Sequence, residues 1–257
     1  MELNLENKTI IISGSSQGIG KNIAKILLQE GCNVVINGRN KNKLNQTFKK
    51  LNTMFKRKLI AIQGDVSKYS TINKIRKATI KKWGKIDGIV ANASTLKGNK
   101  NISNGSKSSN WLMKYNFEMV YNFIGNLIPY IKSKESSIIV IGSIAGIEDI
   151  GAPIYYSVYK SALSAYVKTM SRDLSKKNIR INLISPGNIF FKKSNWEKKL
   201  KENKNKIKNM IKKNVPLNKF GKPEDISVIV SILLSNKTQF ITGSNFVIDG
   251  GQTRSIR

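Results

Sequence analysis

The sequence predicts an α/β fold, a single-domain, doubly wound parallel sheet of about seven strands with helices on both faces. Short apolar runs rich in isoleucine and valine alternate along the chain with longer amphipathic segments of helical length. Such alternation is typical of parallel sheets covered by helices. The 257 residues contain no repeat and no linker that would divide them, so residues 1–257 are expected to form one unit.

The expected strands are short and apolar on both faces, as strands buried between two layers of helices are. In chain order they are residues 9–13, 33–37, 59–63, 88–92, 137–141, 180–184 and 245–248.

The expected helices show the wider apolar spacing of amphipathic helices. Pro223, followed by Glu224 and Asp225, is typical of the first turn of a helix. Residues 97–110 are polar and rich in Gly, Ser and Asn, so they are expected to form a surface loop. The expected helices are residues 19–30, 41–55, 70–83, 111–132, 154–177, 195–213 and 223–235.

The net charge of +30, from 45 basic and 15 acidic residues, raises the question of a nucleic-acid partner. The lysines are spread over nearly every polar face, and they accompany abundant Asn and Ile, which share AT-rich codons. We therefore favour a bias in genome composition, with an acidic partner as the alternative, and expect no nucleic-acid binding. The densest basic stretch, residues 192–213, contains apolar positions that suggest amphipathic helices.

The residue inventory excludes several classes of site. With no histidine and Cys32 as the single cysteine, an internal disulfide, a zinc site of the usual ligands and a Ser-His-Asp triad are all excluded. No apolar run approaches the ~18 residues that a membrane helix needs. The first eight residues show no apolar export segment, so we expect a soluble, cytoplasmic protein that does not bind membranes.

A glycine-rich turn follows the first expected strand and precedes a helix. Glycines there let the backbone turn tightly and approach a pyrophosphate, whose charge is stabilised by the helix N-terminus. The alternative is a strand–helix turn without a ligand. The flanking strand and helix favour a Rossmann-type dinucleotide site. Its expected contacts are Gly14, Ser16, Gln17, Gly18, Ile19 and Gly20.

The end of the second strand indicates which dinucleotide is bound. An acidic residue there would bind the ribose 2′-hydroxyl of NAD, but the chain has Arg39 instead. A guanidinium suits a 2′-phosphate, so we favour NADP(H), with NAD(H) as the alternative if Arg39 is only a surface cation. Asp65, after the third strand, is expected either to accept a hydrogen bond from the adenine amino group or to cap the next helix.

Tyr156 and Lys160 are four residues apart on an expected helix, so their side chains share one face. A nearby ammonium favours the phenolate and is expected to lower the pKa of the phenol from about 10 towards neutral. Such a tyrosine can exchange a proton with an alcohol or a ketone. Ser143, which follows an apolar strand, is expected to hold the same substrate oxygen. Taken alone, the pair is more often a surface tyrosine beside a solvated lysine, and it is the rest of the chain that favours the catalytic interpretation.

With these segments in place, the chain resembles the short-chain dehydrogenase/reductase family over essentially its whole length. The matching segments are Ser13 to Gly20, Gly64-Asp65-Val66, Ala91-Asn92-Ala93-Ser94, Asn116 with Ser143, Tyr156 and Lys160, Pro186-Gly187, Pro223 to Ile226, Ile241-Thr242-Gly243 and Asp249-Gly250-Gly251.

The resemblance implies roles for four residues. Tyr156 would be the general acid in ketone reduction and the general base in alcohol oxidation. Lys160 would lower the pKa of Tyr156 and hold the nicotinamide ribose, and Ser143 would donate to the substrate oxygen. Asn116 would hold a water that relays protons towards Lys160. The resemblance also implies cofactor contacts at Val66, Asn92, Pro186, Gly187 and Ile189.

Two departures from the family pattern lie near the expected cofactor. Ser94 stands where the family has a glycine, and Phe191 falls nearest to the position where the family often has a threonine. Residues 188–214 are expected to form a substrate lid. Its aromatic residues Phe190, Phe191 and Trp196 would line an acyl pocket, stack on a sugar ring or form the core of the lid.

The resemblance is greatest to the 3-oxoacyl-[acyl-carrier-protein] reductases, and it implies reduction of a 3-oxoacyl thioester, with a sugar or polyol as the alternative substrate. Lys134 and Lys177 fall near positions where that group docks its acidic carrier. The remaining alternative is a protein of another class, which keeps the cofactor fold and uses its charge to bind nucleic acid or an acidic partner without catalysis. Family members are commonly dimers or tetramers, with one interface on helices 111–132 and 154–177 and another on the last strand.

Overall fold

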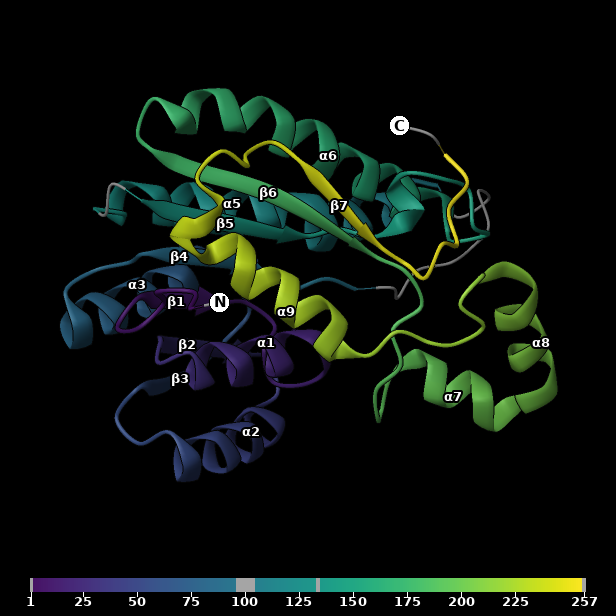
Figure 1. Cartoon of the computed structure of the whole chain (residues 1–257), viewed down its shortest axis with the longest axis horizontal. Coiled ribbons are helices and arrows are strands. Elements are labelled where there is room, and N and C mark those ends of the chain that lie inside the picture. The colour runs from purple at the N-terminus through teal and green to yellow at the C-terminus, as the bar shows by residue number, and fades with distance from the viewer. Residues whose placement is uncertain (1, 96–104, 133–134, 256–257) are drawn as a thin grey trace.

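The structure is a computed structural model that describes residues 2–95, 105–132 and 135–255. In these residues seven strands form one parallel sheet in the order β3-β2-β1-β4-β5-β6-β7 (Figure 1). The predicted fold class is therefore confirmed. The strands are β1 (Thr9–Ile12), β2 (Asn33–Gly38), β3 (Leu59–Gln63), β4 (Gly88–Ala91), β5 (Ser136–Ile141), β6 (Ile179–Pro186) and β7 (Asn245–Ile248).

Two apolar layers bury the faces of the sheet. On one face, α1 (Gly18–Gln29), α2 (Lys41–Met54) and α9 (Pro223–Leu234) pack on the side chains of alternate strand residues such as Ile10 and Ile12. On the other face, α3 (Tyr69–Trp83), α5 (Met119–Leu127) and α6 (Ile154–Ser175) pack on the intervening residues, including Ile11. Strand residues therefore alternate between two cores, which explains why the strands are apolar on both faces.

The region before α5 differs from the expected single helix and its preceding loop. A helix, α4 (Gly105–Met113), covers part of the expected loop 97–110. It continues into a π-helical turn, η2 (Lys114–Glu118), before α5 begins. Pro129 lies in a 3₁₀ turn, η3 (Ile128–Tyr130), because proline lacks the N–H that a continuing α-helix needs. The remaining residues of that loop, 97–104, lie outside the described residues.

The helix expected over residues 195–213 is two helices, α7 (Asn195–Glu202) and α8 (Lys204–Asn214), so that expectation was wrong. Asn203 breaks them with an extended φ of −155°, and its side chain accepts a hydrogen bond from Lys206 N at 3.0 Å. An asparagine that caps a helix in this way competes with helix continuation. Figure 1 shows α7 and α8 projecting to one side of the sheet, with a bend between them.

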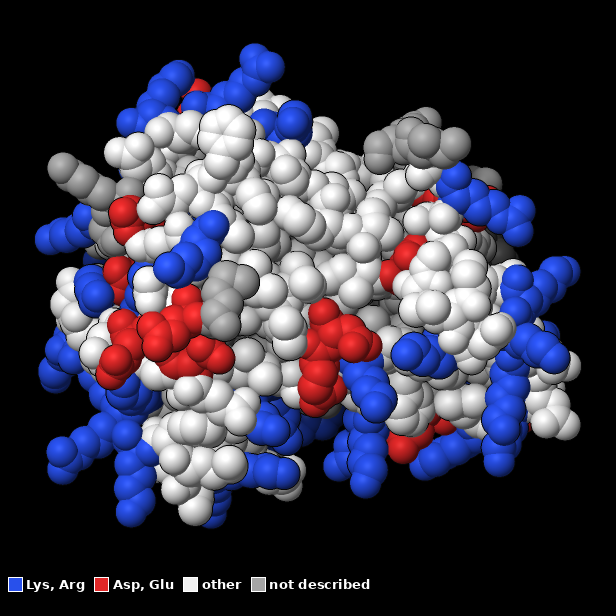
Figure 2. Space-filling view, viewed as in Figure 1, with Lys and Arg blue, Asp and Glu red and all other residues white. Residues whose placement is uncertain are grey.

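The surface charge is widely spread. In Figure 2, lysine and arginine side chains project around most of the rim, whereas the area over β7 is largely uncharged. No helix among the described residues is long and apolar enough to cross a membrane. Cys32 is fully buried, with Sγ 3.3 Å from Leu5 O, and burial raises the pKa of its thiol to about 12.

Gly146 brings a 3₁₀ turn, η4 (Ile144–Gly146), against the backbone of α6. A Cβ at this position would lie 2.5 Å from the carbonyl carbon of Lys160. We expect Gly146→Ala to lower the free energy of unfolding by about 2 kcal/mol, because α6 or η4 must shift.

The matched control is Gly125→Ala in α5, where an added Cβ meets nothing within 4 Å. It should raise the free energy of unfolding by about 0.5–1 kcal/mol through helix propensity. Urea unfolding measures both. If the two substitutions changed the free energy of unfolding equally, the close approach of Gly146 to the Lys160 backbone would be contradicted.

Candidate active site

The expected site residues gather along the carboxyl ends of the central strands. The glycine turn follows β1, Asn92 follows β4, Ser143 follows β5, and Gly187 follows β6. These four strands are neighbours in the sheet, and the chain order reverses between β1 and β4. In open α/β sheets, ligands bind at the carboxyl ends of strands beside such a reversal.

The glycine turn has the shape of a cradle. Gly14 and Gly18 have φ values of +62° and +59°, which side-chain-bearing residues rarely adopt. A Cβ at Gly20 would lie 2.5 Å from Asn92 Nδ2. Among the described residues, no side chain caps the N-terminus of α1, so its first N–H groups face the turn. These features fit a bound diphosphate.

Asn92 braces this turn. Its Nδ2 donates to Ser13 O and to Gly14 O, both at 3.0 Å. The backbone N–H groups of Asn92 and Ala93 donate to Ser13 Oγ, also at 3.0 Å. The Ser13 hydroxyl therefore joins the ends of β1 and β4, and the Asn92 amide supports the backbone of the glycine turn.

Two further expected contacts are fixed by α2. Thr47 Oγ1 donates to Ser16 O at 2.8 Å, and Lys43 Nζ donates to Gln17 Oε1 at 3.0 Å. Ile19 packs partly buried against the apolar core on the α1 side. The whole turn from Gly14 to Gly20 is therefore held in place from both ends.

Arg39 and Asp65 lie together at the ends of β2 and β3. Arg39 Nη1 is 3.8 Å from Asp65 Oδ2, and the arginine side chain is 59% exposed. Asp65 Oδ1 accepts from Ser67 N at 2.9 Å. Burial raises the pKa of Asp65, but hydrogen bonds from Ser67 and Tyr115 and the charge of Arg39 outweigh it and lower the pKa overall. Val66, next in the chain, is buried.

Tyr156 and Lys160 are both buried, at 7% and 1% exposure. Lys160 Nζ donates to Ile141 O at 3.0 Å and lies 5.7 Å from the centroid of the Tyr156 ring. The alternative of a solvated surface pair is therefore wrong. Ser143 forms a side-chain hydrogen bond with Tyr156, and Ser143 Oγ also accepts from Ala145 N at 3.2 Å.

The pKa directions differ from the sequence-based expectation. Burial raises the pKa of Tyr156, and the hydrogen bond with Ser143 offsets this only in part. Burial lowers the pKa of Lys160 to about 8. The expectation that Lys160 lowers the phenol pKa is thus wrong for this structure, because desolvation dominates at both groups.

Asn116 is fully buried in the π-helical turn η2. Its Nδ2 donates to Leu112 O at 3.1 Å, and its Oδ1 accepts from Thr95 N at 3.3 Å. π-helical turns are rare and are frequent at functional sites. The neighbouring Tyr115, which no sequence pattern singled out, contacts Asp65 and Arg39. Only its position beside Asn116 could have drawn attention to it.

The lid segment (residues 188–214) begins beside the glycine turn. The ring of Phe191 packs on Gly18, where an added Cβ would lie 2.6 Å from Phe191 Cζ. Phe190 and Trp196 instead pack on Phe220, with ring centroids 5.9 and 5.4 Å apart. This arrangement favours the lid-core alternative for Phe190 and Trp196.

The base of the lid segment is tied to neighbouring loops. Ile189 forms a bridge with Gly221, and Asn188 Nδ2 donates to Gln252 Oε1 at 2.7 Å. Pro186 is buried at the end of β6, and a Cβ on Gly187 would lie 2.7 Å from Asp249 Cα.

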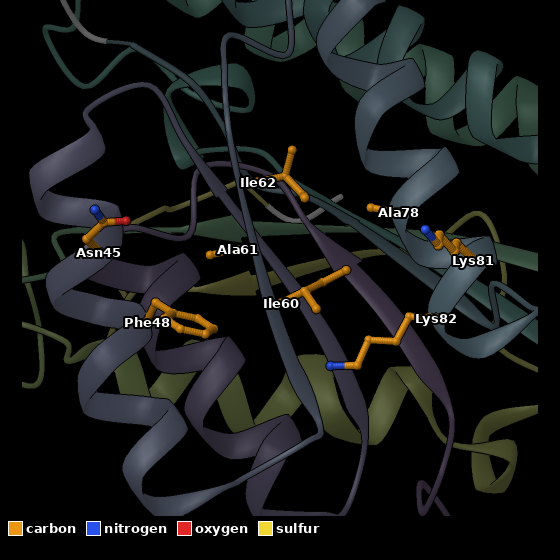
Figure 3. A pocket seen from close by; sticks show the side chains of 8 residues that line it. All are labelled: Asn45, Phe48, Ile60, Ala61, Ile62, Ala78, Lys81 and Lys82. Carbon is orange, nitrogen blue, oxygen red and sulfur yellow. The ribbon is translucent and has the colours of Figure 1, made fainter.

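A cavity of about 640 Å³ lies elsewhere, on the outer side of the edge strand β3 between α2 and α3. Figure 3 shows apolar side chains on its floor and two lysines near its rim. Lys82 Nζ donates to Leu59 O at 3.3 Å, so it covers part of the strand edge. None of the expected catalytic residues lines it. Its lining residues are Asn45, Phe48, Ile60, Ala61, Ile62, Ala78, Lys81 and Lys82.

Known proteins match this chain over nearly its whole length, including the residues at the carboxyl ends of the strands. The family model described as enoyl-(acyl carrier protein) reductase matches residues 14–253. The 3-oxoacyl-[acyl-carrier-protein] reductase FabG of Chlamydia trachomatis is 32% identical over 248 residues, which cover 96% of this chain and 98% of that protein. FabG of Chlamydia muridarum is 31% identical with the same coverage.

Solved structures share the fold over the full chain. L-sorbose reductase from Gluconobacter frateurii, complexed with NADPH and L-sorbose, is 25% identical with a TM-score of 0.91, and the match covers 100% of both chains. A 7α-hydroxysteroid dehydrogenase complexed with NADH and 7-oxo glycochenodeoxycholic acid is 26% identical with a TM-score of 0.89. That match covers 100% of this chain and 98% of the other.

The sheet, the glycine turn and these matches define an NAD(P)-binding oxidoreductase that acts on CH–OH groups. The chain belongs to the short-chain dehydrogenase/reductase family. The resemblance that the sequence motifs indicated is confirmed.

The buried charge of Lys160 makes stability depend on pH. Its pKa of about 8, against 10.5 for an ordinary lysine, means that the folded state disfavours the ammonium by roughly 3 kcal/mol. That cost is fully present below pH 8 and decreases as the pH rises from 8 to 10.5, and above 10.5 the lysine is neutral in both states. We expect Lys160→Met to unfold at higher urea than the wild type at pH 7, with a smaller difference at pH 9.5.

The control is Lys176→Met, since Lys176 is a largely exposed lysine just beyond the end of the same helix. Its effect should be small and nearly the same at both values of pH. If the difference in unfolding urea concentration between Lys160→Met and the wild type did not decrease from pH 7 to pH 9.5, the lowered pKa of Lys160 would be contradicted.

Proposed function

We propose that the protein uses NADP(H) to interconvert a ketone and a secondary alcohol, and that its carbonyl substrate is a 3-oxoacyl thioester on an acyl carrier. The observation that supports this best is the buried Tyr156, hydrogen-bonded to Ser143 and beside Lys160. This group lies at the same edge of the sheet as the glycine turn. The substrate class comes from the FabG relatives, which match nearly the whole chain.

The residues present fit a dinucleotide. Gly14 and Gly18 give the turn its left-handed backbone, Gly20 allows the close approach of Asn92, and the N-terminus of α1, uncapped among the described residues, suits a diphosphate. Arg39 offers a guanidinium for a 2′-phosphate, and no carboxylate follows β2 directly to favour NAD(H) instead. Asp65 and Val66 would hold the adenine, while Pro186, Gly187 and Ile189 would border the nicotinamide.

Each catalytic residue has one task. When bound, the nicotinamide supplies or accepts the hydride. The Tyr156 hydroxyl gives a proton to the carbonyl oxygen in reduction and takes one back in oxidation. The Ser143 hydroxyl donates to the same oxygen as negative charge develops on it. Lys160, which is buried beside the Tyr156 ring, would hold the nicotinamide ribose, and Asn116 would hold a water for proton relay.

The lid segment closes the substrate side. Phe190 and Trp196 give it a core with Phe220, and Phe191 connects it to the cofactor turn. An acidic carrier suits a chain of net charge +30, and Lys177 is exposed at the end of α6. Lys134, the other lysine expected to dock a carrier, lies outside the described residues.

A sugar or polyol is the second candidate substrate, favoured by the full-length likeness to L-sorbose reductase. A binding protein without catalysis is the less favoured class, because the Ser143, Tyr156 and Lys160 set is intact and buried.

We propose that the protein is a cytoplasmic dimer or tetramer, and exposed apolar side chains support the assembly. Tyr121 on α5 and Val158 on α6 are about half exposed, which marks one face. Phe240 and Val247, before and within β7, mark another that Figure 2 shows to be poor in charge over that strand. Apolar surfaces of this kind are typical of protein interfaces.

Turnover tests the substrate and the proton donor together. We expect NADPH oxidation with acetoacetyl thioesters to exceed that with a panel of keto-sugars. Tyr156→Phe should reduce kcat by about 10²–10⁴-fold, because the ring remains but the proton is lost. Tyr155→Phe, one position earlier on α6, is the control and should change kcat less than twofold. Unchanged turnover in Tyr156→Phe would refute the proton-donor role.

Cofactor choice is tested at Arg39. Arg39→Glu should weaken NADPH binding at least about tenfold and NADH binding much less, since only NADPH has the 2′-phosphate. Arg57→Glu gives the same change in net charge at another exposed arginine and should affect both cofactors little. Equal weakening of NADPH and NADH by Arg39→Glu would exclude a 2′-phosphate contact.

A further inference from the structure

Tyr115 connects the two charged residues at the adenosine end of the expected cofactor site. Its hydroxyl donates to Asp65 Oδ2 at 3.3 Å. Its ring centroid lies 5.4 Å from Arg39 Cζ, within the range of a cation–π contact. The three side chains come from three separate elements: the end of β2, the loop after β3 and the π-helical turn η2.

Arg39 needs such support to hold one position. Its side chain is 59% exposed, and its distance of 3.8 Å from Asp65 is long for a direct hydrogen bond. Exposed ion pairs alone fix side chains weakly. The main chain of Arg39 is held by Gln63 Nε2, which donates to its carbonyl at 3.2 Å, and the Tyr115 ring adds a surface for the guanidinium.

The carboxylate of Asp65 is held by two hydrogen bonds, one to each oxygen. Ser67 N donates to Oδ1, and the Tyr115 hydroxyl donates to Oδ2. Both oxygens of the carboxylate are therefore engaged, and Arg39 approaches Oδ2 through Nη1 at 3.8 Å. A guanidinium has five N–H donors, so the others can engage a phosphate in a bidentate manner.

We propose that Tyr115 is a positioning residue that prepares Arg39 for the 2′-phosphate and so determines the preference for NADPH over NADH. This inference rests on the proposed NADP(H)-dependent function. The π-helical turn places Tyr115 towards Asp65 and its neighbour Asn116 towards Thr95. One turn therefore serves both the adenosine end and the proton-relay end of the site.

Two variants separate the ring from the hydroxyl. Tyr115→Phe keeps the ring and loses the bond to Asp65, whereas Tyr115→Leu loses both. We expect the Kd for NADPH, measured by fluorescence titration, to rise about threefold in Tyr115→Phe and about tenfold in Tyr115→Leu. The Kd for NADH should change less than twofold in either variant.

A double-mutant cycle shows whether Tyr115 acts through Arg39. In an Arg39→Ala background, Tyr115→Leu should add almost nothing to the loss of NADPH affinity. The matched control is Tyr130→Leu. Tyr130 forms a similar stack with Arg76, at 4.2 Å from ring centroid to Cζ, just before β5 at the amino-terminal edge of the sheet. Its removal should leave both Kd values unchanged.

Three results would overturn the inference. One is equal weakening of NADPH and NADH in Tyr115→Leu, and another is full additivity with Arg39→Ala. The third is an unchanged Kd for NADPH in both Tyr115 variants while the wild type still prefers NADPH, which would leave the proposed function intact. A wild-type chain that binds NADPH no better than NADH would overturn the proposed cofactor and this inference together.

Discussion

The junction between β1 and β4 is the constraint on which the site depends. Ser13 Oγ accepts from two backbone N–H groups after β4, and Asn92 Nδ2 donates to two carbonyls of the glycine turn. These bonds fix the turn where the strand order reverses, so the cradle of Gly14, Gly18 and Gly20 keeps its shape. In the proposed function, a dinucleotide on this turn would extend towards the ends of β5 and β6, which Ser143 and Gly187 follow.

The residues proposed to carry out catalysis are placed where burial lowers the stability of the fold. Lys160 is fully buried, and its ammonium donates to a backbone carbonyl, that of Ile141. A buried cation without a carboxylate is costly, which is why its pKa falls to about 8. The same burial raises the pKa of Tyr156, because the charged form of a tyrosine is the anion. The proposed proton exchange would therefore take place at buried groups, at the expense of stability.

The sequence was sufficient to predict the sheet and most of the expected site, and the reasons are physical. Strands buried on both faces give unmistakable apolar runs, and Gly14, Gly18 and Gly20 are spaced as a tight turn requires. The π-helical turn around Asn116 could not be predicted, because it spans only 5 residues between two α-helices, too few to show a change of apolar period. The pKa direction of Tyr156 depends on how deeply it is buried, which the spacing to Lys160 does not specify. Tyr115 was missed because its partners, Arg39 and Asp65, are distant in the chain.

The buried position of Cys32 has a practical consequence. Its Sγ lies 3.3 Å from the carbonyl of Leu5, with no solvent exposure, and a pKa of about 12 leaves almost no thiolate at neutral pH. Alkylating reagents attack the thiolate and need access to it. The native chain therefore resists modification, and because Cys32 is its single cysteine, the rate of alkylation reports how often the region around β2 opens, without any engineered label.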